Sequence, residues 1–157
     1  MTLQLYNSSM SKQLKLKIVT PEKLILEEMV DQVTLPTSEG EITILPNHMP
    51  LVARLKSGDM VGVVNDEEIP MAVVGGFIET KKTADGVTEV AVLADFAESV
   101  VDMTDEEINK AKSRAEELQK MADNKEVVDF EHFATELERS LTRVKIADKW
   151  RSKKYRK

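Results

Sequence analysis

Apolar and polar residues alternate at every second position over much of the first hundred residues. Leu14, Leu16 and Ile18 would face one side of a strand and the intervening lysines the other, and Val61 and Val63 repeat the pattern. Period-two alternation with β-branched residues is typical of half-buried strands. Turn-forming residues interrupt the pattern at intervals of roughly 8–14 residues, which favours an antiparallel β-sandwich or flattened barrel.

Two glycines, Gly75 and Gly76, lie inside one of these apolar runs. Glycine within a strand marks a β-bulge or a close approach of two backbones. We therefore expect a bulge or a close backbone contact here, and not a ligand-binding loop.

The apolar period changes to about 3.6 residues after position 103. Thr104 followed by Glu107 forms a capping box, in which each side chain accepts a hydrogen bond from an amide at the start of a helix. The expected buried stripe of this helix is Ile108, Ala111, Ala115, Leu118 and Ala122. Asp129 is placed to cap a second helix. The expected buried stripe of the second helix is Phe130, Ala134, Leu137, Leu141 and Val144.

The predicted fold class is therefore α+β, with an N-terminal antiparallel β-sandwich (flattened barrel) followed by a C-terminal two-helix αα-hairpin. We expect a disordered leader over residues 1–13, a β-sandwich domain over 14–100 and a helical hairpin with a basic C-terminal end over 103–157. No Gly- or Pro-rich linker separates the sandwich from the hairpin, so the predicted junction near Asp102 is abrupt.

Charge is distributed unevenly along the chain. The formal net charge is −6, yet residues 139–157 carry nine Lys or Arg and a single acid, Asp148. With Leu137 at the centre of the buried stripe, a turn of about 100° per residue places Ile146 and Trp150 on the opposite face of the helix. The basic residues around that face are Arg139, Arg143, Lys149 and Lys153. Two interpretations stay open: a solvated charged face with an isolated apolar pair, or a recognition surface for an acidic partner helix with Trp150 as its anchor.

The sequence contains none of the residue patterns that catalysis or metal binding requires. There is no Cys, which excludes disulfides, thiolate metal sites and a cysteine nucleophile. His48 and His132 lack the spacing of metal ligands. No Walker loop, dinucleotide glycine motif or nucleophile elbow is present. We therefore expect a protein that is not an enzyme and that holds no cofactor and no metal.

Charge and hydropathy also limit the classes of partner that the protein can bind. Residues 1–102 carry eight basic and sixteen acidic side chains, and an acidic body is a poor binder of phosphate backbones. No stretch approaches the ~18–20 apolar residues of a membrane span. We expect neither nucleic-acid binding nor direct membrane insertion.

Three motifs resemble those of a known family. Residues 38–51 read SEGEITILPNHMPL, which resembles the signature of the epsilon subunit of F-type ATP synthases, with Asn47 in place of the usual Gly. Residues 74–79, VGGFIE, are similar to the family's Gly-Gly-x-x-Glu, and residues 92–95, VLAD, precede Ala97 and Glu98 as in the family. The motifs follow in the family's order and spacing, and the resemblance covers about residues 14–150.

The resemblance implies a non-catalytic subunit of the central stalk, the rotor, that couples c-ring rotation and proton transport to the catalytic head. The implied partners are the gamma subunit, the polar loops of the c-ring and, through the C-terminal helix, an acidic segment of the catalytic beta subunit. The implied role of the helical arm is inhibition of ATP hydrolysis. The implied location is the cytoplasmic face of the plasma membrane, as a peripheral membrane protein of bacterial type.

The resemblance also assigns residues. By position, Glu39, Glu41 and His48 would face the c-ring, with turn stabilisation as the alternative role. The arm contacts would be Arg139, Arg143, Ile146, Lys149, Trp150 and Lys153. Some members bind ATP through an Asp-x-x-Arg pair at the start of the first helix, where this chain has Thr104 and Glu107. A carboxylate in place of a phosphate-binding cation would repel the nucleotide, so we expect ATP binding to be weak or absent.

A different functional class stays open as the alternative. The chain would then be a free-standing β-sandwich adaptor whose basic amphipathic helix binds an acidic protein or an anionic membrane surface. The interruption of the cationic face by Ile146 and Trp150 counts against it.

Overall fold

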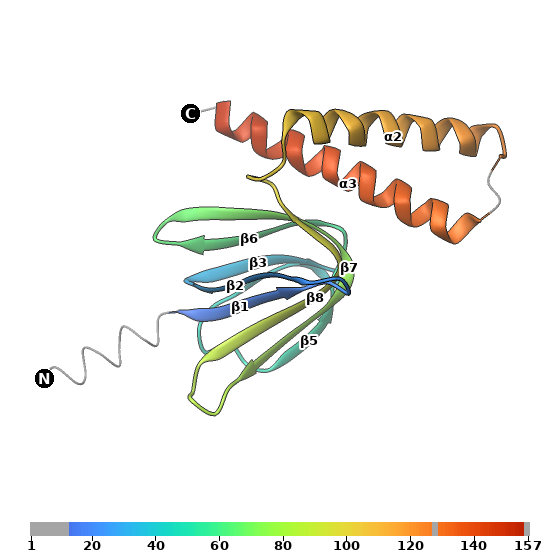
Figure 1. The fold of residues 1–157 in the computed structure, drawn as a ribbon. Coiled ribbons are helices and arrows are strands. Elements are labelled where there is room, and N and C mark those ends of the chain that lie inside the picture. The colour runs from blue at the N-terminus through green and yellow to red at the C-terminus, as the bar shows by residue number, and fades with distance from the viewer. Residues whose placement is uncertain (1–12, 127–128, 156–157) are drawn as a thin grey trace, which may run out of the picture.

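The computed structural model describes residues 13–126 and 129–155 and contains a folded sheet followed by two helices (Figure 1). The strands are β1 (Leu14–Val19), β2 (Leu24–Val30), β3 (Gln32–Thr37), β4 (Gly40–Ile44), β5 (Leu51–Arg54), β6 (Gly58–Val64), β7 (Glu67–Lys82) and β8 (Thr88–Ser99). The helices are α2 (Asp105–Asp123) and α3 (Phe130–Tyr155). This arrangement confirms the predicted fold class. The predicted leader falls almost entirely outside the described residues.

All eight strands belong to one sheet in the order β2-β1-β8-β7-β6-β3-β4, with β5 paired to β7. All of the pairings are antiparallel except that of β1 with β8. The long strand β7 pairs with β6 through its first half and with β5 through its second half. The sheet therefore folds over on itself, and its inward-facing side chains enclose a single apolar core.

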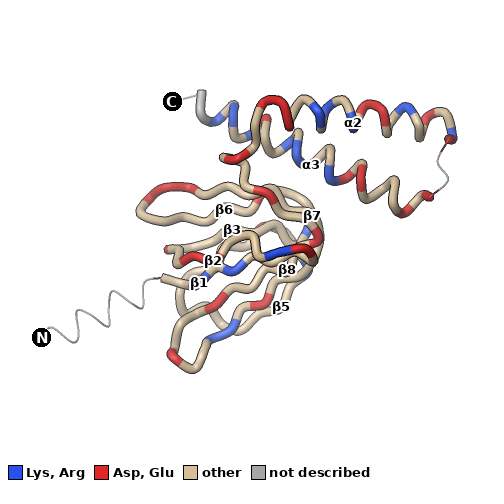
Figure 2. The backbone as a smooth tube through the Cα atoms, viewed as in Figure 1, with Lys and Arg blue, Asp and Glu red and all other residues tan. Residues whose placement is uncertain are grey.

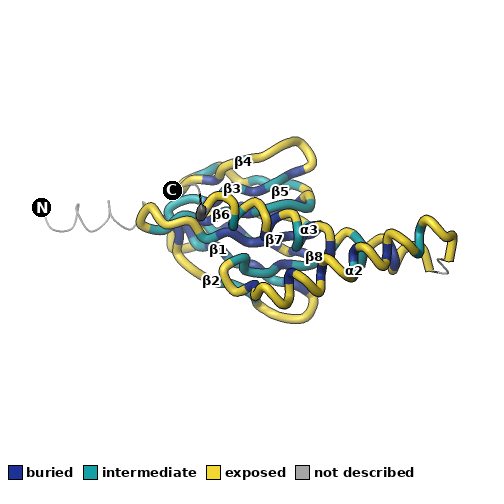
Figure 3. Tube along the Cα trace, turned by 90° about the horizontal axis from the view of Figure 1, so that it is seen from above, coloured by how far each residue is buried: buried dark blue, intermediate teal, exposed yellow. Residues whose placement is uncertain are grey.

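The core follows the alternation seen in the sequence. Leu14, Leu16 and Ile18 are at most 1% exposed, whereas Lys15 and Lys17 are only half-buried on the outer side. Buried residues from six further strands, all but β5, complete this core together with Leu55, and the core takes nothing from the helices. Figure 3 shows buried and more exposed positions alternating along the strands. Burial of apolar area contributes roughly 25 cal/mol per Å², so this core is the main source of the sandwich's stability.

The strand β7 passes very close to β8 at Gly75 and Gly76, as the sequence predicted. Both glycines have positive φ, 59° and 113°. A Cβ on Gly76 would lie 2.0 Å from the backbone oxygen of Leu93. The pairing of β7 with β8 continues past this point in one register, so the close backbone approach is present without a bulge.

The first helix agrees with the sequence in its cap and in its buried face. Thr104 and Glu107 form both hydrogen bonds of the capping box. Four of the five predicted stripe residues are buried, namely Ile108, Ala111, Ala115 and Leu118, and Ala122 is half-buried.

The second helix begins as predicted but buries a different face. Asp129 accepts a hydrogen bond from the amide of His132, 3.2 Å away, which is the expected cap. The predicted stripe is wrong: Phe130, Ala134 and Leu141 are exposed, and Leu137 and Val144 are only half-buried. The buried residues of α3 are instead Phe133, Ser140, Thr142, Ile146 and Ala147. The reason is that α3 contacts both α2 and the strands β6 and β7, so the sheet covers the face that the hairpin alone would leave exposed.

Candidate functional site

The basic face of α3 lies against the sandwich, and its ion pairs join elements far apart in the sequence. Arg143 donates to both carboxylate oxygens of Glu98 on β8, from Nε at 2.7 Å and from Nη2 at 3.0 Å. Both side chains are about a quarter exposed, at 27% and 25%. A two-point contact between a guanidinium and a carboxylate is among the stronger polar contacts in proteins, so it fixes the orientation of α3.

A second contact lies further along α3. Lys149 Nζ donates to Oδ2 of Asp59 on β6 at 2.7 Å, and Trp150 Nε1 donates to the same oxygen at 3.1 Å. The Asp59 side chain is only 14% exposed. One carboxylate of the sandwich thus holds both the charge of Lys149 and the indole of Trp150.

The third contact is nearest the C-terminus. Lys153 Nζ lies 2.8 Å from Oε2 of Glu68, at the start of β7. The same ammonium lies 4.5 Å from the centroid of the Trp150 ring, which is the geometry of a cation–π contact. Figure 2 shows basic positions along the second half of α3 and acidic positions on the β6–β7 hairpin beside it.

Two further contacts join α3 to the sandwich, one apolar and one a weaker polar contact. Ile146 is 3% exposed and packs with Ala147 in a cluster that includes Ala72 of β7, Met103 and Ile108. Arg139 lies over the ring of Phe96, 5.4 Å from its centroid, and Nη2 donates to the backbone oxygen of Asp95 at 3.3 Å.

We call the six residues Arg139, Arg143, Ile146, Lys149, Trp150 and Lys153 the arm face. All six contact the sandwich or the apolar cluster that joins α3 to it. The interpretation of these residues as a solvated charged face with an isolated apolar pair is therefore wrong. Contact with an acidic partner stays a prediction, and the structure adds that such a partner reaches this face only after α3 leaves the sandwich.

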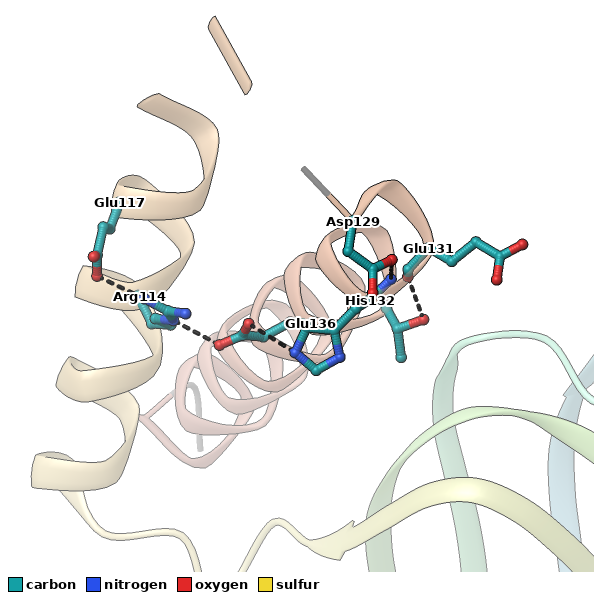
Figure 4. Close-up of polar contacts among 7 residues, drawn as sticks. Arg114, Glu117, Asp129, Glu131, His132 and Glu136 are labelled. Atoms are coloured by element: carbon teal, nitrogen blue, oxygen red, sulfur yellow. Dashed lines mark hydrogen bonds and ion pairs between the residues drawn. The ribbon is translucent and has the colours of Figure 1, made fainter. Parts of the chain in front are cut away.

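An interhelical clamp, which the sequence analysis missed, ties the two helices together (Figure 4). Arg114 of α2 donates from Nε to Glu136 of α3 at 2.6 Å and from Nη1 to Glu117 at 3.0 Å. The hydrogen bond from Arg114 lowers the pKa of Glu136 below its ordinary value of 4.5 and raises that of Arg114. His132 lies 3.9 Å from the other oxygen of Glu136. No sequence pattern links positions 114 and 136, because only the docking of the helices brings them together.

We expect Glu136→Gln to lower the stability of the hairpin by about 1 kcal/mol at pH 7, since partly exposed ion pairs contribute up to that amount. Because the folded pKa of Glu136 is depressed, its contribution is present above the unfolded pKa and is lost as pH falls through the folded pKa. The difference between wild type and variant should therefore shrink below about pH 4.5. Thermal melting followed by helical circular dichroism at pH 7 and pH 3 measures it.

The matched control is Glu131→Gln, because the Glu131 carboxylate makes no ion pair within residues 13–126 and 129–155. Equal melting shifts for the two variants would show that the clamp contributes nothing to stability.

At the start of α2, where some family members bind ATP, acidic side chains of the helix itself surround the backbone amides. The Glu107 carboxylate accepts a hydrogen bond from the backbone amide of Thr104 at 2.9 Å, and this hydrogen bond lowers the pKa of Glu107. The first turn also carries Asp105 and Glu106. Two of these carboxylates pair with cations, Asp105 with Arg151, and Glu106 with Lys110 at 3.4 Å. Weak or absent ATP binding stays a prediction, and the three carboxylates at this helix start agree with it.

The described residues hold no group of three or more His, Asp or Glu arranged to bind a metal ion. His48 lies in the loop after β4 and His132 lies on α3, in separate parts of the molecule. No helix among the described residues has the length and apolar character to cross a membrane.

Comparisons with known proteins cover the sandwich and the arm together. Residues 13–100 match the family described as ATP synthase, Delta/Epsilon chain, beta-sandwich domain. The ATP synthase epsilon chain of Nitratidesulfovibrio vulgaris is 39% identical over 137 residues, which are 87% of this chain and 97% of that one. The chain belongs to the ATP synthase epsilon family. The epsilon chain of Dehalococcoides mccartyi is 40% identical over 141 residues, covering 88% and 95% of the two chains.

A solved structure has the same fold as this epsilon-family chain. A chain in the cryo-EM structure of the Euglena gracilis mitochondrial ATP synthase, comprising OSCP, F1 and the c-ring, superposes with a TM-score of 0.57. The superposition covers 90% of this chain and 81% of that one at 20% sequence identity. At this identity the likeness concerns the fold alone.

The loop residues that the epsilon signature singles out do not form one site. Glu39 and Glu41 are exposed at the β3–β4 turn, whereas His48 lies in the loop that follows β4. Since a strand rises about 3.3 Å per residue, these two places are about 13 Å apart along β4. The His48 ring contacts the backbone oxygen of Met49 through Nδ1 at 2.8 Å. Asn47, which stands where the family usually has Gly, adopts a positive φ of 69°.

The sequence analysis missed an exposed apolar surface on the outer side of the sheet. Val52 of β5, Phe77 of β7 and Leu93 of β8 are 72%, 56% and 52% exposed. Phe77 and Leu93 are direct partners across the two strands, and Val52 lies two residues from the partner of Phe77. Contiguous exposed apolar residues mark interaction surfaces, so this outer-sheet face is a candidate contact site of the epsilon-family chain.

Proposed function

We propose that this chain is a non-catalytic central-stalk subunit of a proton-translocating F-type ATP synthase. In this proposal the sandwich couples c-ring rotation to the catalytic head, and the helical arm inhibits ATP hydrolysis. The observation that carries it is the match to epsilon chains over almost their whole length, arm included. The protein would lie at the cytoplasmic face of a bacterial plasma membrane, held there by its partners.

The gamma subunit is the proposed partner of the outer-sheet face. Val52, Phe77 and Leu93 stand on three adjoining strands of a rigid sheet, so they present a fixed apolar surface of the kind that a stable interface needs. The arm covers a different part of the sandwich, around Ala72 and Asp59. Gamma could therefore bind the sandwich whether or not the arm is docked.

The c-ring is the proposed partner of the β3–β4 turn. Glu39 and Glu41 are exposed there, and Gly40 with a φ of 116° gives the turn its shape. Because His48 lies at the other end of β4, it can share a partner with Glu39 and Glu41 only if that partner spans the strand. The arm face is proposed to meet an acidic segment of the catalytic beta subunit.

The test is reconstitution with a cognate catalytic head that contains gamma. We expect the full-length chain to inhibit ATP hydrolysis, and a chain ending at Asp102 to bind gamma without inhibiting, because the sandwich core takes no residue from the arm. Phe77→Glu should weaken gamma binding at least tenfold, since a charge would replace an interface aromatic residue. Binding is measured by surface plasmon resonance and hydrolysis by phosphate release.

Glu79→Gln is the control, because residue 79 lies on the same side of β7 and is exposed but not apolar. Equal inhibition by the truncated and the full-length chain would contradict the role of the arm. Unchanged gamma binding by Phe77→Glu would contradict the assignment of the outer-sheet face.

A further inference from the structure

We propose that Thr88, the first residue of β8, is a positioning residue for His48. Its hydroxyl holds the turn before His48 in one conformation, and so sets how the loop of residues 45–50 meets the c-ring. We call residues 45–50 the His48 loop. The proposal rests on the proposed coupling function and on the assignment of His48 to the c-ring, and it adds which residue fixes the geometry of that contact.

The His48 loop begins with a β-turn over residues 45–48. The amide of His48 donates to the backbone oxygen of Leu45 at 3.1 Å. Pro46 is the second residue of the turn, and Asn47, with a φ of 69°, is the third. Proline followed by a residue of positive φ is typical of a type II turn, whereas the commoner type I turn has a negative φ at its third residue. The two types differ by rotation of the single peptide group between Pro46 and Asn47.

The amide that this rotation would move is held by a buried hydroxyl. The N–H of Asn47 donates to Oγ1 of Thr88 at 2.7 Å, across 41 residues of sequence. Thr88 is 2% exposed, so water has little access to replace its hydroxyl. Rotation with the chain held in place would bring the carbonyl oxygen of Pro46 well inside hydrogen-bond distance of Oγ1, because that oxygen projects about 1.2 Å from its carbon. The rotated form therefore requires the loop to move away from β8.

The sequence of the turn makes this hydrogen bond decisive. Asn tolerates a positive φ better than most residues, but it still prefers a negative one, which only Gly does not. The two forms of the turn are therefore close in free energy, and one hydrogen bond is enough to decide between them. Without the Thr88 hydroxyl, we expect the type I form to be populated as well.

The conformation of the turn determines where the side chains of the loop point. The ring of His48 lies against the backbone oxygen of Met49, with Nδ1 at 2.8 Å. Leu45 and Met49 are 52% and 73% exposed on either side of His48. A rotated peptide between Pro46 and Asn47 would redirect these three side chains together. Thr88 thus fixes the surface that the loop presents to a partner.

A second buried threonine provides a matched control. Thr80 of β7 is 1% exposed, and its Oγ1 has no hydrogen-bond partner within residues 13–126 and 129–155. Thr80 pairs with Val90, and Thr88 precedes Val90 by two residues, so the two threonines are diagonal neighbours on the inner side of the sandwich. They share burial and surroundings, but Thr88 binds the His48 loop and Thr80 does not.

The first experiment compares Thr88→Val with Thr80→Val in the full-length chain, since each replaces a hydroxyl by a methyl group at nearly constant volume. Hydrogen exchange of the Asn47 amide, followed by NMR, should be about three- to tenfold faster in Thr88→Val because its acceptor is gone. Thr88→Ser keeps the acceptor and should exchange like the wild type. Thr80→Val should leave the exchange unchanged.

The second experiment measures the ratio of ATP-driven proton pumping to ATP hydrolysis in a reconstituted ATP synthase that contains each variant. We expect Thr88→Val to lower this ratio about twofold or more, and Thr88→Ser and Thr80→Val to keep it. Adding Asn47→Gly to Thr88→Val should recover most of the loss, because glycine adopts a positive φ without strain. A threonine that only stabilised the fold would not be rescued by a change in an exposed turn.

The outcomes separate this proposal from the proposed function. A wild-type chain that does not support pumping coupled to hydrolysis overturns the proposed function. If the wild type couples, unchanged exchange of the Asn47 amide in Thr88→Val overturns the positioning role of Thr88 alone. Faster exchange with an unchanged pumping ratio overturns it as well, because the conformation of the turn would then not matter for coupling.

Discussion

Replacing Gly76 with alanine is expected to lower the free energy of unfolding of the sandwich by about 4 kcal/mol, because a steric clash and backbone strain add at one position. The new Cβ would lie 2.0 Å from the backbone oxygen of Leu93 and 2.9 Å from Cα of Ala94. A backbone atom cannot move aside as a flexible side chain can, so β7 and β8 would have to separate. The φ of 113° is also one that alanine rarely adopts.

Urea unfolding of the full-length chain, followed by circular dichroism, measures this loss. The total stability of a domain is about 5–15 kcal/mol, so the variant should be close to unfolded at 37 °C. Gly86→Ala is the matched control, since Gly86 has a φ of 79° but open space where the Cβ would lie. It should cost about 1 kcal/mol, from backbone strain alone. Similar losses for both variants would show that the close approach of β7 to β8 is unimportant for stability.

Reversing two charges of the arm face, with Arg139→Glu and Arg143→Glu, is expected to relieve inhibition of ATP hydrolysis and to leave gamma binding intact. Both residues would then repel an acidic segment of the catalytic head. Arg143→Glu also places a carboxylate against Glu98, so the arm would leave the sandwich as well. We expect at least a tenfold rise in the half-inhibitory concentration, because two attractive pairs become repulsive.

Hydrolysis by the reconstituted head, measured at two salt concentrations, tests this prediction. Trp150→Ala should weaken inhibition by about 2 kcal/mol if Trp150 anchors the contact. Added salt should weaken inhibition by the wild type, since exposed pairs are screened over about 8–10 Å. The control is Lys110→Glu with Lys120→Glu, an equal charge change on α2. Inhibition that survives the double reversal and Trp150→Ala would refute a role for the arm face.

The sequence by itself determined the elements of this protein and the family to which it belongs. Strand alternation, as at Leu14 to Ile18, and the capping box of Thr104 and Glu107 depend on residues two to four positions apart, so they are readable locally. The close approach at Gly75 and Gly76 was readable because only glycine tolerates it. The epsilon signature at 38–51 needed no structure either.

Only the tertiary structure decided which surfaces are covered. The apolar face of α3 assigned from the hairpin alone was wrong, because strands more than 40 residues away in sequence cover another face of the helix. Ala72 packs with Ile146, Glu98 binds Arg143 and Asp59 binds Lys149. The clamp between Arg114 and Glu136 and the exposure of Phe77 beside Leu93 likewise depend on how distant segments dock. Periodicity shows that a helix or strand has two unlike faces, but what lies against each face is set by packing between elements.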